Sequence, residues 1–346
     1  MSFTRLRSTY IALIGFSLVL VLSSCGLLDG QGPGKNWLTD VSMRKEAFSI
    51  ELVGERVAAP TPDKSVDKFL DDEIEDANLD RRKFAEIYAK ALLKVKKGYT
   101  LESVNDNQIR LKPASGELES YGVENAWMEG KNIPGHRKEV MRPYLAANRN
   151  AEHADIPTKA NIIPVVRGED MLTTIGQLAD QAAADDKAKG KPHSDKTIFH
   201  QSIAPGIILV LMEDSPYSLR SITVDDIKVL NIKDSDIAGE FNKHLVMRLP
   251  SKITFFGSDV ILADAGGDFD SSIVLCDKIM STVKKQVKGK LVFSVPNRSA
   301  VFFTGDSLPS SIEKIRSFTE YAAANQARPV SPLLYTWDNG KIEQYK

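Results

Sequence analysis

Two arginines and one acid lie beside the most apolar segments of the chain, where they could do chemistry. Arg167 ends the apolar run that starts at Ile162, whereas Asp214 and Arg220 follow the apolar segment Gly206–Glu213. Charged groups at the ends of buried strands either pair with one another or hold an anionic ligand. Structural pairing is the favoured interpretation. The alternative is an anionic-ligand-binding module, which predicts one pocket containing the guanidinium groups of Arg167 and Arg220.

Three acids in a glycine-containing loop form a second candidate. Asp264, Asp268 and Asp270, with Gly266 and Gly267 between them, could offer oxygen ligands to a hard cation. The spacing lacks the terminal bidentate Glu of a calcium loop, and a strand-to-helix turn with acids near a helix N-terminus explains the same residues. We therefore predict no metal site.

The remaining metal-ligating and nucleophilic side chains are scattered. The five histidines have no paired spacing and are His136, His153, His193, His200 and His244. Cys276 falls on an apolar helical stripe, which favours a buried, inert thiol. No cofactor is predicted.

A serine nucleophile is the third candidate. The block Gly305-Asp306-Ser307-Leu308 resembles the block that names one family of serine esterases, whose chemistry would need Ser307 to be activated by a histidine oriented by an acid. In those enzymes the acid and the histidine follow the serine, whereas here no histidine follows His244. A polar turn at a helix entry is therefore favoured over the alternative of a membrane-tethered hydrolase.

The N-terminal segment has the features of an export signal. Arg5 and Arg7 precede a largely apolar run from Ile11 to Leu22, which is too short for a spanning helix of roughly 20 residues. Leu22-Ser23-Ser24-Cys25 resembles a bacterial lipobox. That resemblance implies a diacylglyceryl thioether on Cys25, cleavage before this residue, and acylation of the new amino group. Several acyl chains anchor a protein stably, whereas one chain binds a membrane only marginally.

The residue after Cys25 bears on localisation. Gly26 stands where Asp retains a lipoprotein at the inner membrane in enterobacteria-like sorting, so we expect a periplasm-facing protein on the outer membrane if the host has two membranes. Residues 25–45 are predicted to be a lipid-anchored flexible tether, because they are rich in glycine. The predicted partners are the membrane, through the lipid, and an unidentified envelope protein.

Composition limits the other classes of function. Removal of residues 1–24, which carry Arg5 and Arg7 and no acid, would bring the net charge of −1 to about −3, so no basic excess points to nucleic acid. The chain of 346 residues is long enough for one large or two smaller cores. With only two cysteines, a lipidated Cys25 leaves no internal disulfide.

Helical and alternating patterns of apolar residues predict an α+β protein. Predicted helices cover 81–97, 135–149 (with a kink or division at Pro143), 171–184, 223–230, 241–249, 271–288 and a segment that a Ser310/Glu313 capping box begins. Predicted strands cover 45–56, 100–104, 108–112, 118–123, 160–167, 206–213, 217–222, 252–256, 260–263, 291–295, 300–303, 332–337 and 341–345.

The order of several short motifs resembles the YtpQ-like family of uncharacterised bacterial proteins. The motifs are Asn161–Arg167, Glu213–Arg220, Gly267–Ser272, Phe293–Arg298 and Leu333–Gln344. The resemblance implies an architecture rather than an activity. This chain differs from the family in its lipoprotein signal and in the charged segment 185–196.

These observations together predict antiparallel sheet units with helices packed on one face, in two helix–sheet–helix halves. The predicted divisions are a signal peptide at 1–24, the tether at 25–45, an N-terminal subdomain at 46–157 and a C-terminal subdomain at 158–346. The predicted function is that of a lipid-anchored, non-enzymatic binding or interaction module of the cell envelope.

Overall fold

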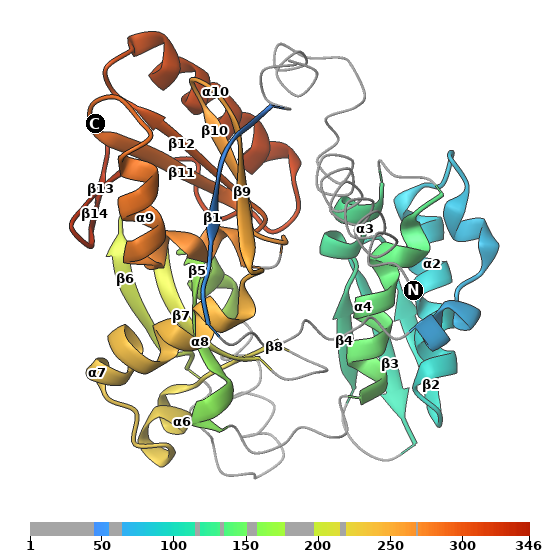
Figure 1. Ribbon diagram of the computed structural model, residues 1–346. Helices are drawn as coiled ribbons and strands as arrows, with labels where there is room; N and C mark the ends of the chain where they lie inside the picture. The colour runs from blue at the N-terminus through green and yellow to red at the C-terminus, as the bar shows by residue number, and fades with distance from the viewer. Residues whose placement is uncertain are drawn as a thin grey trace, which may run out of the picture. The chain divides into compact units, whose positions relative to one another are not determined.

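The computed structural model describes residues 45–54, 64–114, 118–131, 135–150, 158–176, 197–214, 219–267 and 269–346 (Figure 1). The fold is α+β, as predicted, and all strand pairings in the described segments are antiparallel. The chain divides into two compact units. The first contains residues 60–155 and 325–328, and the second contains 36–59, 156–324 and 329–346. Cys25 and its neighbours lie outside the described residues.

The first unit packs helices on one three-stranded sheet. Its elements in chain order are η2 (Lys64–Phe69), η3 (Asp72–Glu75), α2 (Arg81–Val95), β2 (Tyr99–Val104), β3 (Gln108–Pro113), β4 (Glu119–Gly122), α3 (Glu124–Gly130) and α4 (Arg137–Asn150). The sheet order is β2-β3-β4, and the apolar faces of α2 and α4 form one core with Ile109 and Leu111 of β3. The predicted N-cap of α2 is confirmed, since the Asp80 side chain accepts the Lys83 N–H at 2.7 Å. Helix α4 runs through Pro143 without being divided.

The second unit contains a seven-stranded sheet and a four-stranded sheet (Figure 1). The larger sheet has the order β1-β9-β10-β12-β11-β13-β14, with strands β1 (Glu46–Glu51), β9 (Lys252–Gly257), β10 (Ile261–Asp264), β12 (Ala300–Gly305), β11 (Leu291–Asn297), β13 (Leu334–Asp338) and β14 (Lys341–Gln344). The smaller sheet has the order β5-β7-β6, and β8 also pairs with β7; its strands are β5 (Ile162–Gly168), β7 (Ile207–Asp214), β6 (His200–Ala204) and β8 (Leu219–Ser221).

Strands β5 and β7 of the smaller sheet are buried on both faces, which agrees with their nearly continuous apolar sequences. Alternate residues of β7 enter different cores: Ile208 and Val210 pack with residues of the larger sheet, while Leu209 and Leu211 pack with Phe241 and its neighbours. Residues of α6 (Val224–Val229) and of the π-helical turn η6 (Ile237–Phe241) pack in this second core, whereas Leu245 of α8 (Asn242–Arg248) packs in the core shared with the larger sheet. The short elements η5 (Lys159–Asn161) and α7 (Asp234–Asp236) directly precede β5 and η6. Residues of α6 and η6 therefore pack on one face of the smaller sheet, and the other face shares a core with the larger sheet.

Helix α10 (Pro309–Asn325) packs on the larger sheet. The rings of Phe318 and Phe302 lie 5.8 Å apart, and Thr319 Oγ1 donates a hydrogen bond to Ser294 Oγ at 2.7 Å. The predicted capping box of Ser310 and Glu313 is wrong, because the helix already begins at Pro309. Proline is suited to the first helical position, where no N–H is needed.

Two further sequence predictions need correction. The predicted strand at 45–56 forms as β1, but β1 pairs with β9, so residues 46–51 belong to the second unit and not to an N-terminal subdomain starting at residue 46. The predicted helix 271–288 is instead a 3-10 helix, η7 (Asp270–Leu275), followed by α9 (Asp277–Lys284). Hydrogen bonds to distant residues hold η7: Ser271 N–H donates to Arg298 O, and Ser272 Oγ accepts the Val166 N–H. These contacts override the local helical pattern.

Candidate functional site

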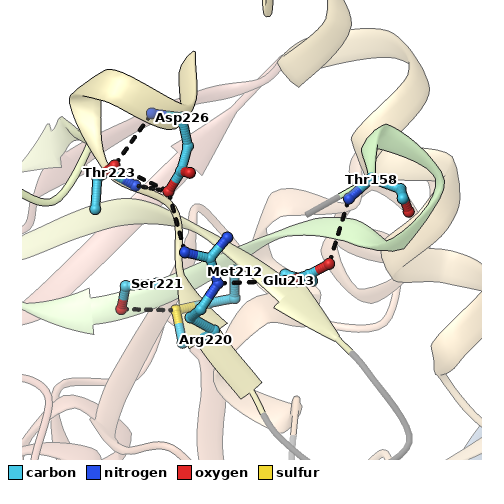
Figure 2. Close-up of polar contacts among 7 residues, drawn as sticks. All are labelled: Thr158, Met212, Glu213, Arg220, Ser221, Thr223 and Asp226. Carbon is cyan, nitrogen blue, oxygen red and sulfur yellow. Dashed lines mark hydrogen bonds and ion pairs between the residues drawn. The ribbon is translucent and has the colours of Figure 1, made fainter. Parts of the chain in front are cut away.

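Arg220 lies between two carboxylates at the β7–β8 pairing (Figure 2). Its Nε is 3.3 Å from Glu213 Oε2, and its Nη1 is 3.3 Å from Asp226 Oδ2. Glu213 stands directly opposite Arg220 in the register, and its other carboxylate oxygen accepts the Thr158 N–H at 3.3 Å. The guanidinium group therefore holds β8, β7 and the start of α6 together.

Asp226 also forms hydrogen bonds at the start of its own helix, α6. Thr223 and Asp226 form a capping box at the start of α6, in which Asp226 accepts the Thr223 N–H at 2.9 Å and donates its own N–H to Thr223 Oγ1 at 3.1 Å (Figure 2). Burial raises the pKa of the Asp226 carboxyl, but the Thr223 hydrogen bonds and Arg220 outweigh burial, so the pKa lies below its usual value. The carboxylate therefore stays ionised beside Arg220.

Arg167 does not join this cluster. In the β5–β7 register Arg167 stands opposite Ile208, whereas Arg220 stands opposite Glu213 on the same strand β7. Five residues along a strand separate these positions by about 17 Å. The Arg167 side chain is 2 % exposed, and its Nη1 donates to the Val166 carbonyl at 2.7 Å. The hypothesis of one anion pocket containing both guanidinium groups is therefore wrong.

Asp214 has a different arginine as its partner. Arg248, at the end of α8, places Nε 2.5 Å from Asp214 Oδ2, and both side chains are largely buried. This pair attaches α8 to the end of β7. Sequence reasoning missed Arg248, because no local pattern connects residues 34 positions apart. It could have found Asp226, which occupies the third helical position after Thr223 as a capping box requires.

Asp264 and Asp270 of the 264–270 loop accept hydrogen bonds from backbone N–H groups of the same loop. Asp270 is 1 % exposed, and its Oδ1 accepts the N–H groups of Ala265 at 3.2 Å and Gly267 at 2.8 Å. Asp264 Oδ1 accepts the Gly266 N–H at 3.2 Å. Asp268 lies outside the described residues. Within the described segments, no cluster of three metal-ligating side chains occurs, and the two described acids close a turn.

The block around Ser307 is a packed turn. Asp306 Oδ1 accepts the Lys290 N–H at 2.7 Å, and the Ser307 N–H donates to Lys288 O at 3.3 Å. A Cβ at Gly305 would lie 2.0 Å from Lys288 O, so this close approach of two backbones requires glycine. Among the described residues, no histidine or carboxylate forms a hydrogen bond with Ser307 Oγ. The alternative of a hydrolase using Ser307 therefore gains no support from the geometry.

The other reactive side chains are also accounted for locally. Cys276 precedes α9 and is 5 % exposed, and burial raises the pKa of its thiol to about 12. His244 Nδ1 lies 3.0 Å from the Ile162 carbonyl, and His200 Nδ1 lies 3.2 Å from the Ile198 carbonyl. His153 and His193 lie outside the described residues.

A groove in the second unit is the feature that sequence reasoning missed. Its volume is about 610 Å³, and the eleven described residues that line it are Glu169, Asp170, Gly206, Glu320, Ala323, Ala324, Pro329, Val330, Ser331, Pro332 and Leu333. Its apolar lining residues, here called the floor of the groove, come from the end of α10 and from the segment 329–333, which precedes β13. Glu169 and Asp170, which follow β5, and Glu320 on α10 also line it. The lining residues come from several separate segments of the sequence, so no local sequence pattern could predict the groove.

Hydrogen bonds hold the segment 329–333 that lines the groove. Ser331 Oγ and Tyr335 Oη lie 2.6 Å apart, and the Tyr335 hydroxyl donates to Pro205 O at 2.9 Å. Gly206 has φ of +82°, and a Cβ there would lie 3.1 Å from Ser331 Oγ, so glycine suits both the turn and the close packing. Burial raises the pKa of the Tyr335 hydroxyl to about 12, which keeps this donor protonated.

No helix in the part of the chain that the structure describes combines the length and the apolar character needed to cross a membrane. The comparisons with known proteins add no relative, since no family model matches the chain and no similar curated protein or solved structure is found.

Proposed function

We propose that this chain is a lipid-anchored protein of the bacterial cell envelope whose folded body is a binding module. The lipid anchor is proposed because the sequence Leu22-Ser23-Ser24-Cys25 follows a short apolar run. Thioether and amide acylation at Cys25 supplies several chains, which is what stable attachment to a bilayer requires. Gly26 in the following position favours the outer membrane in a host with two membranes.

The folded body supports binding through a preformed groove. The candidate charged groups Arg220, Asp214 and Asp270 are all engaged in contacts that hold the fold. By contrast, the groove at Ala323 and Leu333 is open, and its volume of about 610 Å³ lies within the usual range of ligand sites. We also propose that the chain is related to the YtpQ-like family, on the five motifs that carry the resemblance.

The anchor is tested by the intact mass and the membrane fractionation of the wild-type protein and of Cys25→Ala. The wild type is expected to lose residues 1–24, gain the mass of the acyl groups and enter the detergent phase. Cys25→Ala is expected to keep residues 1–24 and to incorporate no labelled fatty acid. Cys276→Ala is the matched control, because it removes the other cysteine and should remain lipidated. Equal fatty-acid incorporation by Cys25→Ala and the wild type would overturn the proposal.

A further inference from the structure

The charge of the groove and its apolar floor together indicate the class of its ligand. Glu169, Asp170 and Glu320 line it, and the described lining contains no basic residue. None of these three carboxylates has an ion-pair partner in the part of the chain that the structure describes. This contrasts with the acids Glu213 and Asp226, which both pair with Arg220. Unpaired carboxylates around an apolar surface favour a ligand that carries positive charge on an apolar body.

Backbone hydrogen bonds within the protein stabilise the shape of the groove without a ligand. The Val330 N–H donates to Pro296 O at 2.8 Å, and the Ser331 N–H donates to Val295 O at 3.0 Å, so the floor segment is attached to β11 by its backbone. A further backbone hydrogen bond joins two other lining residues, since the Glu169 N–H donates to Gly206 O at 3.3 Å. A preformed site loses little conformational entropy on binding, which favours affinity for a small molecule.

The size of the groove favours a small molecule over a protein surface. Eleven described residues line it, whereas a standard protein interface uses about 20–30 residues on each side. Its volume of about 610 Å³ fits a compact organic molecule.

We propose that this groove binds a small organic cation, an ammonium group attached to an apolar body, with the ammonium near Glu169, Asp170 and Glu320 and the body on Ala323, Val330 and Leu333. The inference deepens the proposed function and rests on it for the role of a binding module. It does not depend on the lipid, so fractionation of Cys25→Ala and titration of the groove can fail independently.

The test uses the full-length protein in phosphatidylcholine nanodiscs, with empty nanodiscs as the blank, and ligand-observed NMR titrations. The probes are 4-phenylbutylammonium, its neutral analogue 4-phenylbutan-1-ol, its anionic analogue 4-phenylbutyrate, and butane-1,4-diammonium, which has charge without an aromatic body. The proposal expects saturable binding of 4-phenylbutylammonium at millimolar concentration or below, and weaker binding of the other three.

Variants connect that binding to the groove. Glu169→Gln and Glu320→Gln are each expected to weaken binding of 4-phenylbutylammonium about two- to five-fold, the range of an exposed ion pair. Ala323→Trp should abolish binding by filling the floor. Glu313→Gln is the matched control, since Glu313 is an exposed acid on the same helix outside the groove.

Three results would overturn the proposal. The first is equal binding of the alcohol and the ammonium, which would remove the role of charge. The second is an equal loss of binding in Glu313→Gln and Glu320→Gln, which would place the effect outside the groove. The third is an absence of saturable binding of 4-phenylbutylammonium to the wild type under conditions where a lysine-containing peptide binds, which would make the occupant a protein segment.

Discussion

Glu75 caps the helix that starts at Arg137. Its Oε2 accepts the Arg137 backbone N–H at 2.9 Å, and its Oε1 accepts the Lys138 N–H at 2.8 Å. A carboxylate at a helix N-terminus satisfies donors that have no partner within the helix and interacts favourably with the helix dipole. Because η3 and α4 are separated by about 60 residues, this cap is a tertiary contact within the first unit.

We predict that Glu75→Ala destabilises the first unit by about 1–2 kcal/mol, the usual effect of removing a helix cap. Hydrogen exchange measured by mass spectrometry should show faster exchange at the start of α4. Glu73→Ala is the control on the same short helix, because Glu73 pairs with Lys83 at an exposed position and its loss should change exchange little. Equal effects of the two substitutions would contradict this assignment of the cap.

The Arg137 side chain has its own structural role. It is 1 % exposed, and it donates to the carbonyls of Gly130 at 2.9 Å, Ile74 at 2.9 Å and Lys131 at 3.2 Å. Arg137→Lys should cost about 2 kcal/mol or more in the free energy of unfolding, because one ammonium group cannot reach carbonyls arranged for a planar fork. Urea denaturation checks this, with the exposed Arg82→Lys as the control. An unchanged midpoint for Arg137→Lys would show that the carbonyls find other donors.

The Asp264 carboxyl makes stability depend on pH in a defined direction. Burial raises its pKa above the ordinary value of 3.8, and the hydrogen bond from Gly266 opposes this only in part. Its contribution to stability is therefore complete below the unfolded pKa and is lost as the pH rises through the folded pKa. We expect Asp264→Asn to be more stable than the wild type at pH 7, with the advantage disappearing below about pH 3.8. Thermal unfolding across this range measures it, and an advantage independent of pH would exclude ionisation as its cause.

Cys276 should be unreactive in the native protein. Since burial raises the pKa of its thiol to about 12, iodoacetamide at pH 8 is expected to leave it unmodified until the protein unfolds. The chain has two cysteines, so a thioether at Cys25 predicts one reactive thiol in the denatured protein. Peptide mapping after labelling identifies the site. Rapid native labelling of Cys276 would contradict its burial.

Gly26→Asp is expected to change the membrane in which the protein resides. If the host has two membranes and follows enterobacteria-like sorting, the variant should move from the outer to the inner membrane while keeping its lipid. Sucrose-gradient separation of the membranes measures the change, and Gly26→Ser is the control for substitution at this position. An unchanged distribution would exclude sorting by residue 26.

Elements with a local pattern could be predicted from the sequence. The apolar stripe of α2, with Asp80 before it, correctly predicted a capped helix, and Asp338-Asn339-Gly340 correctly predicted the turn between β13 and β14. The segment 271–288 was predicted wrongly, because Ser271 and Ser272 take their hydrogen-bond partners from residues 298 and 166. Hydrogen-bond partners so distant in the chain do not change the local spacing of apolar residues, which is what the prediction used.

In the candidate site, too, the features with a local sequence pattern could be predicted and those that depend on tertiary contacts could not. Thr223 was correctly predicted as a cap, but the number of residues between Arg167 and Arg220 along the chain could not reveal that the β5–β7 register separates them. The groove was missed because Glu169 and Glu320 come from distant elements that only the tertiary fold brings to one surface. The sequence could therefore indicate which groups are charged, but not which of them have no ion-pair partner among the described residues.

The pairing of β1 with β9 sets an order of assembly. Ile50 stands opposite Ile253, so about 200 residues must be synthesised between the two partners. The other six strands of this sheet all lie between Lys252 and Gln344, so they pair with one another over much shorter separations along the chain. Closing so long a loop carries an entropic cost that local hairpins avoid, and long-range pairings slow folding. The strand that is made first is thus expected to join the sheet last.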